Sequence, residues 1–301
     1  MYSSLAIPST ARQFHDRIYS GEIIRFTDLQ PMTKLVEYAR TFLEDALHPW
    51  QPQQIHRYLS HREQAVRFSK CQSDFAGSAE VQHRWLDVVE SLGIAPDTLA
   101  CDRLHLRFQP HREPEQFTPR ARTTATIAFH RDTWGSNIYA QTNWWAPIYP
   151  ITAGRTFALY PGLWQRPLLN SSADFDMRAV LQRSHRDGRN AVDADEAIPH
   201  LLEAIDPQEG FAVDIAPGSL IAFSGAHAHA GVGNSTGLTR ISFETRSILI
   251  DDLMSGLGAP NVDGQAPWMT PGLFRRMSDA MRLSQILGCG YIEPYRPATV
   301  S

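Results

Sequence analysis

The chain has 301 residues, of which 43% are hydrophobic and 20% charged, and its formal net charge is −4. This balance is typical of a globular protein. The charge leaves no positive excess to neutralise phosphates, so we expect no nucleic-acid partner. No apolar run reaches the roughly 18 residues of a membrane span, and the first residues lack a signal-peptide pattern. Three widely spaced cysteines indicate reduced thiols, so we expect a cytoplasmic protein.

The first hundred residues are predicted to be mostly helical. The stretch TKLVEYARTFLED places Leu35, Tyr38, Ala39 and Phe42 at spacings of three and four, as one face of a helix requires. The stretch AEVQHRWLDVVESLG ends in a glycine, a residue that commonly terminates helices. The sequence therefore predicts helices within residues 33–92.

From about residue 103 the hydrophobic period changes to two. Runs rich in β-branched and aromatic residues are separated by turns that contain proline and glycine. We predict short strands in these runs, at residues 103–110, 123–132, 137–151, 156–160, 210–225 and 239–250.

Two further segments complete the chain. Residues 170–209 are polar and partly helical, and we expect an insertion between strands that covers the mouth of the fold as a lid. Residues 251–301 are predicted to form a helical tail, with a helix at 270–287. A mostly helical part at 1–100 followed by many short strands predicts one mainly-β domain over 1–301, a β-sandwich or jelly roll at 101–250 with flanking helices.

The first chemical motif is FHRDTW, in which His130 and Asp132 are two residues apart. On an extended strand such residues point to the same face, so an imidazole and a carboxylate can converge on one metal ion. One more histidine would complete the 2-His-1-carboxylate triad, which binds Fe(II) and leaves coordination positions open.

The second motif is HAHAG, which supplies two candidates for that histidine. His227 and His229 share a face if the segment is extended, so periodicity does not separate them. The residue that does not bind the metal is expected beside the site, hydrogen-bonded to a ligand or to a backbone carbonyl.

The third motif is Arg240 with Ser242, on the strand that follows. A 2-oxo acid would fill two open positions of the metal, and its far carboxylate would need a buried cation. Arginine suits this task because its guanidinium makes two parallel hydrogen bonds to a carboxylate. Arg246 lies on the same face and remains the rival anchor.

Taken together, these segments resemble the phytanoyl-CoA dioxygenase family of Fe(II)/2-oxoglutarate-dependent oxygenases. The likeness rests on the His-x-Asp pair, on NWWAPIYPITAGRTFALYPGLW, and on HAGVGNSTGLTR, where Asn234 and Arg240 follow His229 by five and eleven residues. The resemblance implies a double-stranded β-helix (jelly roll) core. It also implies an iron site made by His130, Asp132 and His229.

The same resemblance implies that Arg240 and Ser242 bind 2-oxoglutarate. Related halogenases have a small residue in place of the ligand carboxylate, so Asp132 favours hydroxylation. The predicted function is therefore oxidation of a small, largely apolar substrate, such as a natural-product intermediate, by O2, with release of succinate and CO2. Trp134, Trp145 and His227 are the candidate substrate-pocket residues. The alternative function is a non-catalytic jelly-roll protein that binds a metal or a small molecule.

Overall fold

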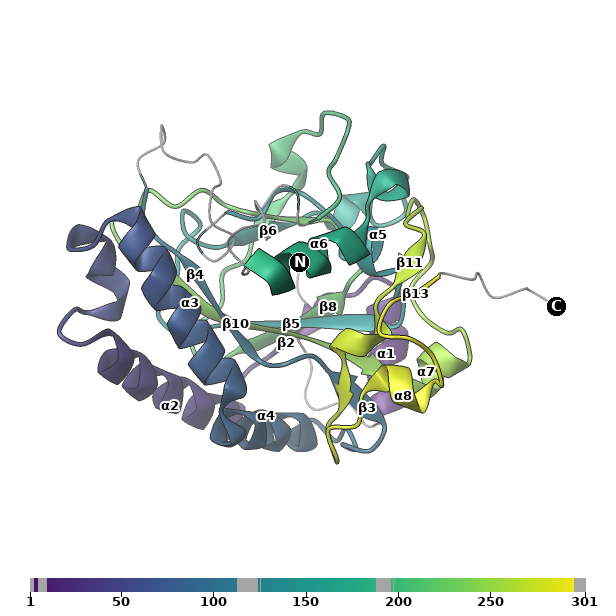
Figure 1. The fold of residues 1–301 in the computed structure, drawn as a ribbon, viewed down its shortest axis with the longest axis horizontal. Helices are drawn as coiled ribbons and strands as arrows, with labels where there is room; N and C mark the ends of the chain where they lie inside the picture. Colours follow the sequence, from purple (N-terminus) through teal and green to yellow (C-terminus); the bar gives the residue numbers. More distant parts are fainter. Residues whose placement is uncertain are drawn as a thin grey trace.

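The structure is a computed structural model that describes residues 10–112, 124, 126–187, 196 and 198–294, with the backbone of Ser3–Ser4. Its N-terminal part contains the predicted helices, namely α1 (Ala11–Tyr19), α2 (Gln30–Leu47), the 3-10 helix η1 (Pro52–Arg57), α3 (His61–Gly77) and α4 (Ala79–Ser91). Ser60 and Glu63 form a capping box at the start of α3. Gly93, at φ +74°, follows the end of α4, as the sequence predicted. Figure 1 shows α2, α3 and α4 gathered along one side of the molecule.

The predicted strands form two main sheets. The larger sheet has the order β1-β2-β8-β5-β10-β3-β12, and β4 also pairs with β10. All its pairs are antiparallel except β1 with β2. Its strands are β1 (Ser3–Ser4), β2 (Ile24–Phe26), β3 (Leu99–Cys101), β4 (His105–Gln109), β5 (Gln141–Pro147), β8 (Leu220–Ser224), β10 (Arg240–Leu249) and β12 (Arg275–Arg276).

Side chains alternate along each strand of the larger sheet, so one face is apolar and packs against the helices. The other, here called the polar face, carries the charged residues of β4 and β10 together with the apolar Trp145, Ile221 and Phe223. On β10, Phe243 points to the helices and lies 5.8 Å from the ring of Phe75 on α3. On β4, the ring of Phe108 stacks on Phe68 of α3 at 4.1 Å. The alternate residues of these two strands, including Arg240 of β10, face the other way and line a cavity. One apolar cluster runs from α1 through the sheet to Leu283, so the helical part and the strands share a core.

The smaller sheet covers the polar face of the larger one. It has the order β7-β6-β9, with β6 (Phe157–Leu159), β7 (Phe211–Ala212) and β9 (His229–Gly231). Phe157 contacts Trp145 and Phe223 of the larger sheet, with ring centroids 5.0 and 5.9 Å away. The expectation of a mainly-β fold with flanking helices is therefore confirmed as antiparallel sheets with helices packed against them.

Two predicted elements differ in the structure. Within the predicted strand at 123–132, residues 123 and 125 lie outside the described residues. The described rest is not a regular strand: it forms one isolated bridge with β9, between His130 and His229, and the Ile127 carbonyl accepts from the Gly231 N–H at 2.8 Å. The predicted helix at 270–287 is reduced to η8 (Pro271–Leu273), β12 and α8 (Leu283–Ile286). Asp279 ends the helical pattern there, because its carboxylate accepts from Arg276 and from the Met281 N–H, and Ala280 adopts φ +59°.

The insertion at 170–209 is partly helical, as expected, with η4 (Ser172–Asp174), α6 (Met177–Asp187) and η7 (Pro207–Glu209). Residues 188–195 and 197 of this insertion lie outside the described residues. The remaining elements are α5 (Thr133–Ser136), η3 (Pro161–Leu163), α7 (Ile250–Met254), β11 (Trp268–Met269) and β13 (Glu293–Pro294). Cys71, Cys101 and Cys289 are free thiols. Among the described helices, none is both long and apolar enough to cross a membrane.

Candidate metal centre

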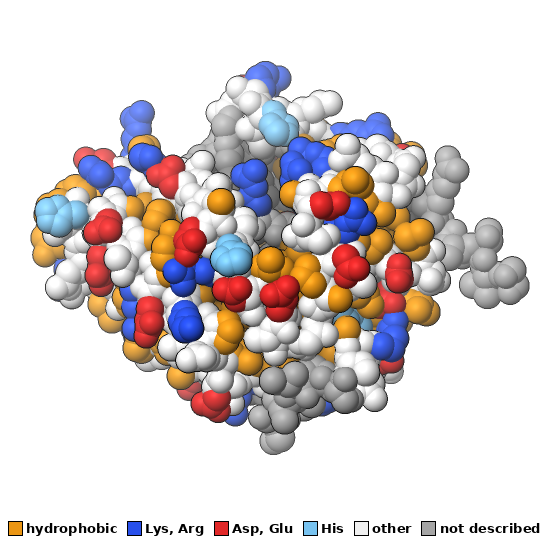
Figure 2. All heavy atoms as spheres, turned by 90° about the horizontal axis from the view of Figure 1, so that it is seen from below, with side chains coloured by type: hydrophobic (Ala, Val, Ile, Leu, Met, Phe, Trp, Pro, Cys, Tyr) orange, Lys and Arg blue, Asp and Glu red, His pale blue; other side chains and the backbone are white. Residues whose placement is uncertain are grey.

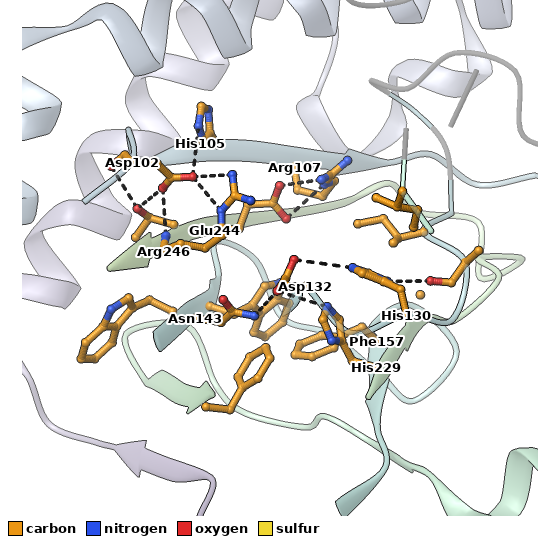
Figure 3. Close-up of a pocket in the computed structure, with 18 of the residues that line it drawn as sticks. Asp102, His105, Arg107, His130, Asp132, Asn143, Phe157, His229, Glu244 and Arg246 are labelled. Carbon is orange, nitrogen blue, oxygen red and sulfur yellow. Dashed lines mark hydrogen bonds and ion pairs between the residues drawn. The ribbon is translucent and has the colours of Figure 1, made fainter. Parts of the chain in front are cut away.

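His130, Asp132 and His229 lie together between the two sheets. One potential ligand atom from each residue falls within 4.8 Å of the others. Asp132 lies 3.7 Å from His130 Nε2 through Oδ1 and 4.0 Å from His229 Nε2 through Oδ2. Figure 3 shows the carboxylate pointing toward both rings. The structure thus brings together the three side chains that the sequence proposed as ligands.

Backbone pairing aligns the two histidines. His130 and His229 form an isolated antiparallel bridge, in which each N–H donates to the carbonyl of the other residue, at 3.0 and 2.9 Å. Directly opposed residues project their side chains to the same face, so the ring centroids lie 4.3 Å apart. A two-residue contact between distant segments therefore places both imidazoles.

Asp132 reaches the site by a turn and not along an extended strand. It is the N-cap of α5, with φ −61° and ψ −33°. The residue before it, Arg131, is almost fully buried, and its guanidinium donates to the carbonyls of Leu163 and Ala226 at 2.6 and 2.7 Å. Arg131 also pairs with Asp263 at 3.2 Å. This buried arginine, which sequence analysis did not select, holds the short loop between two ligands.

Hydrogen bonds fix the tautomer of both histidines. The Nδ1 atom of His130 lies 2.9 Å from the carbonyl of Ala128, and Nδ1 of His229 lies 3.0 Å from the carbonyl of His227. Because a carbonyl can only accept, Nδ1 carries the proton in each ring. The Nε2 atoms are therefore left with a free lone pair, which is the state that a metal ion requires.

The electrostatics of the site favour an ionised carboxylate and neutral imidazole. Burial opposes the charge of Asp132, but the neighbouring His130 and His229 and the charge of Arg246 outweigh it and lower its pKa. Burial and the neighbouring His130 lower the pKa of His229 to about 4. Asn143 adds a hydrogen bond from its amide to Asp132 Oδ2, and Gln141 in turn donates to Asn143 Oδ1 at 2.8 Å. Asn143 on β5 thus orients the ligand carboxylate.

His227 does not face the site. It lies in the turn before β9, so the expectation of a shared face with His229 does not apply. Its ring is fully buried against Trp164, with centroids 4.4 Å apart, and its Nε2 lies 3.1 Å from the carbonyl of Gly21. Burial lowers the pKa of His227 to about 3, so the ring is neutral. Its backbone carbonyl, and not its side chain, contacts His229.

Arg240 and Ser242 present unpaired polar atoms on the polar face of β10. Arg240 is 6% exposed and Ser242 is fully buried. Among the described residues, no hydrogen-bond partner exists for Nε and Nη1 of Arg240 or for Oγ of Ser242. Burial and the nearby charge of Arg107 lower the pKa of Arg240 to about 10, so it stays charged at neutral pH. A buried cation without a partner is costly, so this position suits an anionic ligand.

The turn that returns the chain to Arg240 is held by Asn234. This buried side chain donates to the carbonyls of Gln109 and Leu238 at 2.8 and 2.7 Å. Its Oδ1 atom accepts from Thr236 at 2.8 Å. The residues between His229 and β10 therefore form an ordered turn.

The rival anchor, Arg246, is already paired. Its Nε and Nη2 donate to Asp102 Oδ2 at 2.8 and 2.6 Å. A second pair lies beside it, in which Arg107 bonds both oxygens of Glu244 at 2.6 and 3.1 Å. Figure 3 shows both pairs along the cavity wall opposite His130 and Asp132.

The metal-ligand cluster opens on a cavity of about 200 Å³. Arg240 and Trp145 line it, as does Ile198 from the insertion. Trp134 does not line it, because its ring is fully buried in an apolar cluster and its indole N–H bonds Asp263 at 2.7 Å. Of the candidate pocket residues, the structure therefore places only Trp145 in the cavity.

Comparisons with known proteins give structural likeness only. No family model matches the chain, and no curated protein matches it. A structure of EvdO2 from Micromonospora carbonacea var. aurantiaca complexed with 2-oxoglutarate is 14% identical, with a TM-score of 0.45, over 81% of this chain and 93% of that chain. The apo non-heme monooxygenase ThoJ is 14% identical, with a TM-score of 0.44, over 78% and 77%. The apo form of EctD from S. alaskensis is 15% identical, with a TM-score of 0.42, over 93% and 90%. These values are too low to assign a family or an activity.

Proposed function

We propose that this protein is a non-haem Fe(II)/2-oxoglutarate-dependent oxygenase. One observation carries the proposal: a two-histidine, one-carboxylate cluster and a buried arginine without a partner among the described residues line the same cavity. The cluster alone would suit several metal-binding functions. The arginine adds a place for a carboxylate at the metal, which is what a 2-oxo acid co-substrate needs.

The ligands and the anchor have distinct tasks. His130 and His229 would hold Fe(II) through Nε2, and Asp132 through its carboxylate. Arg240 and Ser242 would bind the far carboxylate of 2-oxoglutarate. The bound iron and 2-oxoglutarate would provide the chemistry: a reaction with O2 that converts 2-oxoglutarate to succinate and CO2 and oxidises the substrate. Trp145 and Phe157 are buried side chains that line the cavity and would limit the access of water to the site.

Several finer features belong to the same proposal. The chain would be a phytanoyl-CoA dioxygenase-like protein with a double-stranded β-helix core and a single oxygenase domain. Hydroxylation of a small molecule is the proposed reaction, because Asp132 supplies a carboxylate where related halogenases have a small residue. The three free thiols support the proposed cytoplasmic location.

A spectroscopic experiment tests the proposal against a non-catalytic binding function. Protein mixed anaerobically with Fe(II) and 2-oxoglutarate should show the weak visible charge-transfer band of 2-oxoglutarate chelated to iron. Admission of air should then give slow succinate release without substrate. If the band and succinate are both missing at saturating 2-oxoglutarate, the oxygenase function is wrong.

Two alanine variants test the choice of histidine. His229→Ala should lose iron, because it removes an Nε2 ligand. His227→Ala should retain iron, because only its backbone carbonyl contacts the site. Iron content after anaerobic loading and desalting is the measurement, and iron loss in His227→Ala alone would reverse the assignment.

A further inference from the structure

A second hollow borders the metal cavity. It is a groove of about 850 Å³ between α4, α6 and the C-terminal segment. Asp102, His105 and Arg246 line both the groove and the metal cavity. The pair formed by Asp102 and Arg246 therefore stands between the groove and the metal ligands. A molecule lying in the groove could reach the metal past this pair.

The groove is strongly basic although the chain is acidic overall. Its described lining contains one carboxylate, that of Asp102, and this group is already paired with Arg246. The lining also contains five arginines, which are Arg103, Arg246, Arg275, Arg276 and Arg282. Figure 2 shows acidic and basic side chains interspersed over one face of the molecule. The described lining of the groove has an excess of positive charge.

Three of these arginines have no carboxylate partner among the described residues. Arg276 is bonded to Asp279 through Nε and Nη2. Arg275 and Arg282 each donate one hydrogen bond to a backbone carbonyl, at 3.0 Å in both cases. No hydrogen bond or ion pair of Arg103 exists within the described part. Most of the donors of these three side chains remain available to a ligand.

The three arginines without a carboxylate partner are neighbours, and the guanidinium of Arg282 also lies 5.3 Å from the centre of the Tyr291 ring. Partial burial and the positive charges of Arg282 and Arg103 lower the pKa of Arg275. Arg275 and Arg282 also form an isolated β-bridge, so their backbones are directly opposed. Like charges held together repel each other, and a ligand with several anionic oxygens would relieve that repulsion.

We propose that the groove binds a phosphate or diphosphate group of the substrate through Arg103, Arg275 and Arg282. The portion to be oxidised would extend past Asp102 and Arg246 to the metal. Each guanidinium group can donate paired hydrogen bonds to phosphate oxygens. A single carboxylate has too few oxygens to accept from all three arginines, whereas a phosphate or diphosphate has enough. This substrate class differs from the largely apolar molecule expected from the sequence. The assignment of the ligand as substrate rests on the proposed oxygenase function, whereas the binding of the anion does not.

Pyrophosphate is the probe that tests the site. Isothermal titration of the metal-free full chain should show binding that weakens as salt is raised, because the contacts are largely electrostatic. Arg103→Ser/Arg275→Ser should weaken binding by about tenfold or more. Arg276→Ser is the matched control, since this arginine lines the same groove but is held by Asp279, and it should change the affinity by less than about threefold. Absence of binding to the wild type at millimolar pyrophosphate, or equal weakening in the control, would overturn the proposal.

Two further measurements exclude unfolding of the variant and binding of pyrophosphate at the metal cavity. Thermal unfolding should be unchanged in the double variant; if that variant does not fold, Arg103→Ser replaces it, because Arg103 is exposed. Pyrophosphate should not compete with 2-oxoglutarate in the uncoupled succinate assay. Competition, together with loss of pyrophosphate binding in Arg240→Ala, would place the anion at the metal cavity and contradict the groove. A protein that binds pyrophosphate in the groove but makes no succinate would keep the site and refute the oxygenase function.

Discussion

Strand β10 carries two arginines in opposite situations. Arg240, at the start of the strand, is 6% exposed and its Nε and Nη1 have no partner among the described residues. Arg246, farther along the same face, has a side chain that is 35% exposed and is fully engaged by Asp102. Burial of an unpaired charge is unfavourable, so a fold maintains it only where function requires it. The comparison supports the proposal that Arg240 binds the co-substrate, whereas the ion pair of Arg246 with Asp102 forms part of the cavity wall.

The largest expected effect is on co-substrate binding. Arg240→Ala should raise the Kd for 2-oxoglutarate by about 100-fold or more, because it removes one partner of a buried charge pair. Its iron content should stay at the wild-type level. Quenching of tryptophan fluorescence by 2-oxoglutarate in the anaerobic Fe(II) protein measures the Kd. Arg246→Ala is the matched control, and a weaker Kd in the control alone would exchange the roles of the two arginines.

The next prediction compares how the two arginines contribute to the free energy of unfolding. Arg246→Met leaves Asp102 buried without its ion pair and should lower the free energy of unfolding by about 2–3 kcal/mol. Arg240→Met breaks no hydrogen bond of Nε or Nη1 within the described part and should leave that free energy unchanged or raise it. Urea unfolding of the metal-free proteins, without 2-oxoglutarate, checks both. Equal destabilisation by the two changes would mean that Arg240 is structurally paired.

The third prediction concerns Asn143, which connects β10 to the proposed metal ligand Asp132. Asn143 is directly opposite Arg246 in the sheet and donates to Asp132. Asn143→Ala should weaken iron binding about tenfold, because the ligand carboxylate loses the group that orients it. Competition with a chelator measures the affinity. Thermal unfolding serves as the control, and unchanged iron affinity in a folded variant would exclude this positioning role.

The smallest effect concerns the pair formed by Arg107 and Glu244. Burial alone would raise the pKa of Glu244, but the charge and hydrogen bonds of Arg107 lower it from 4.5 to about 2. A lowered carboxyl pKa contributes stability at pH values above 4.5, and the contribution is lost as the pH falls from there toward 2. Glu244→Gln should therefore reduce the unfolding free energy by about 1–2 kcal/mol at pH 7 and by progressively less below pH 4.5.

Urea unfolding at a series of pH values measures this difference. Glu90→Gln is the control, because Glu90 is exposed, and it should show little difference at any pH. A difference between wild type and Glu244→Gln that stays constant down to pH 3 would show that the ionised carboxylate is not what stabilises the pair.

Sequence patterns predicted most of the fold and selected the three side chains that the structure brings together as a candidate ligand set. The helical spacing in α2 and the alternation in β4, β5 and β10 are local properties, so they could be recognised without tertiary information. The same patterns failed at 270–287, where the Asp279 carboxylate accepts from the Met281 N–H in a turn that interrupts the predicted helix. They also failed for Trp134 and for Asp132, which lie on a short helix and at its N-cap and not on a strand.

The sequence by itself identified His130, Asp132, His229 and Arg240 as candidates, because residue types and their spacing along the chain can be recognised without tertiary information. Only the tertiary structure decided which histidine faces the site and which arginine is free. The bridge between His130 and His229 turns one ring inward, and His227 remains in the preceding turn. Asp102 pairs with Arg246 across a gap of 144 residues. Such pairings depend on the register of segments that are distant in the chain, which no local pattern encodes.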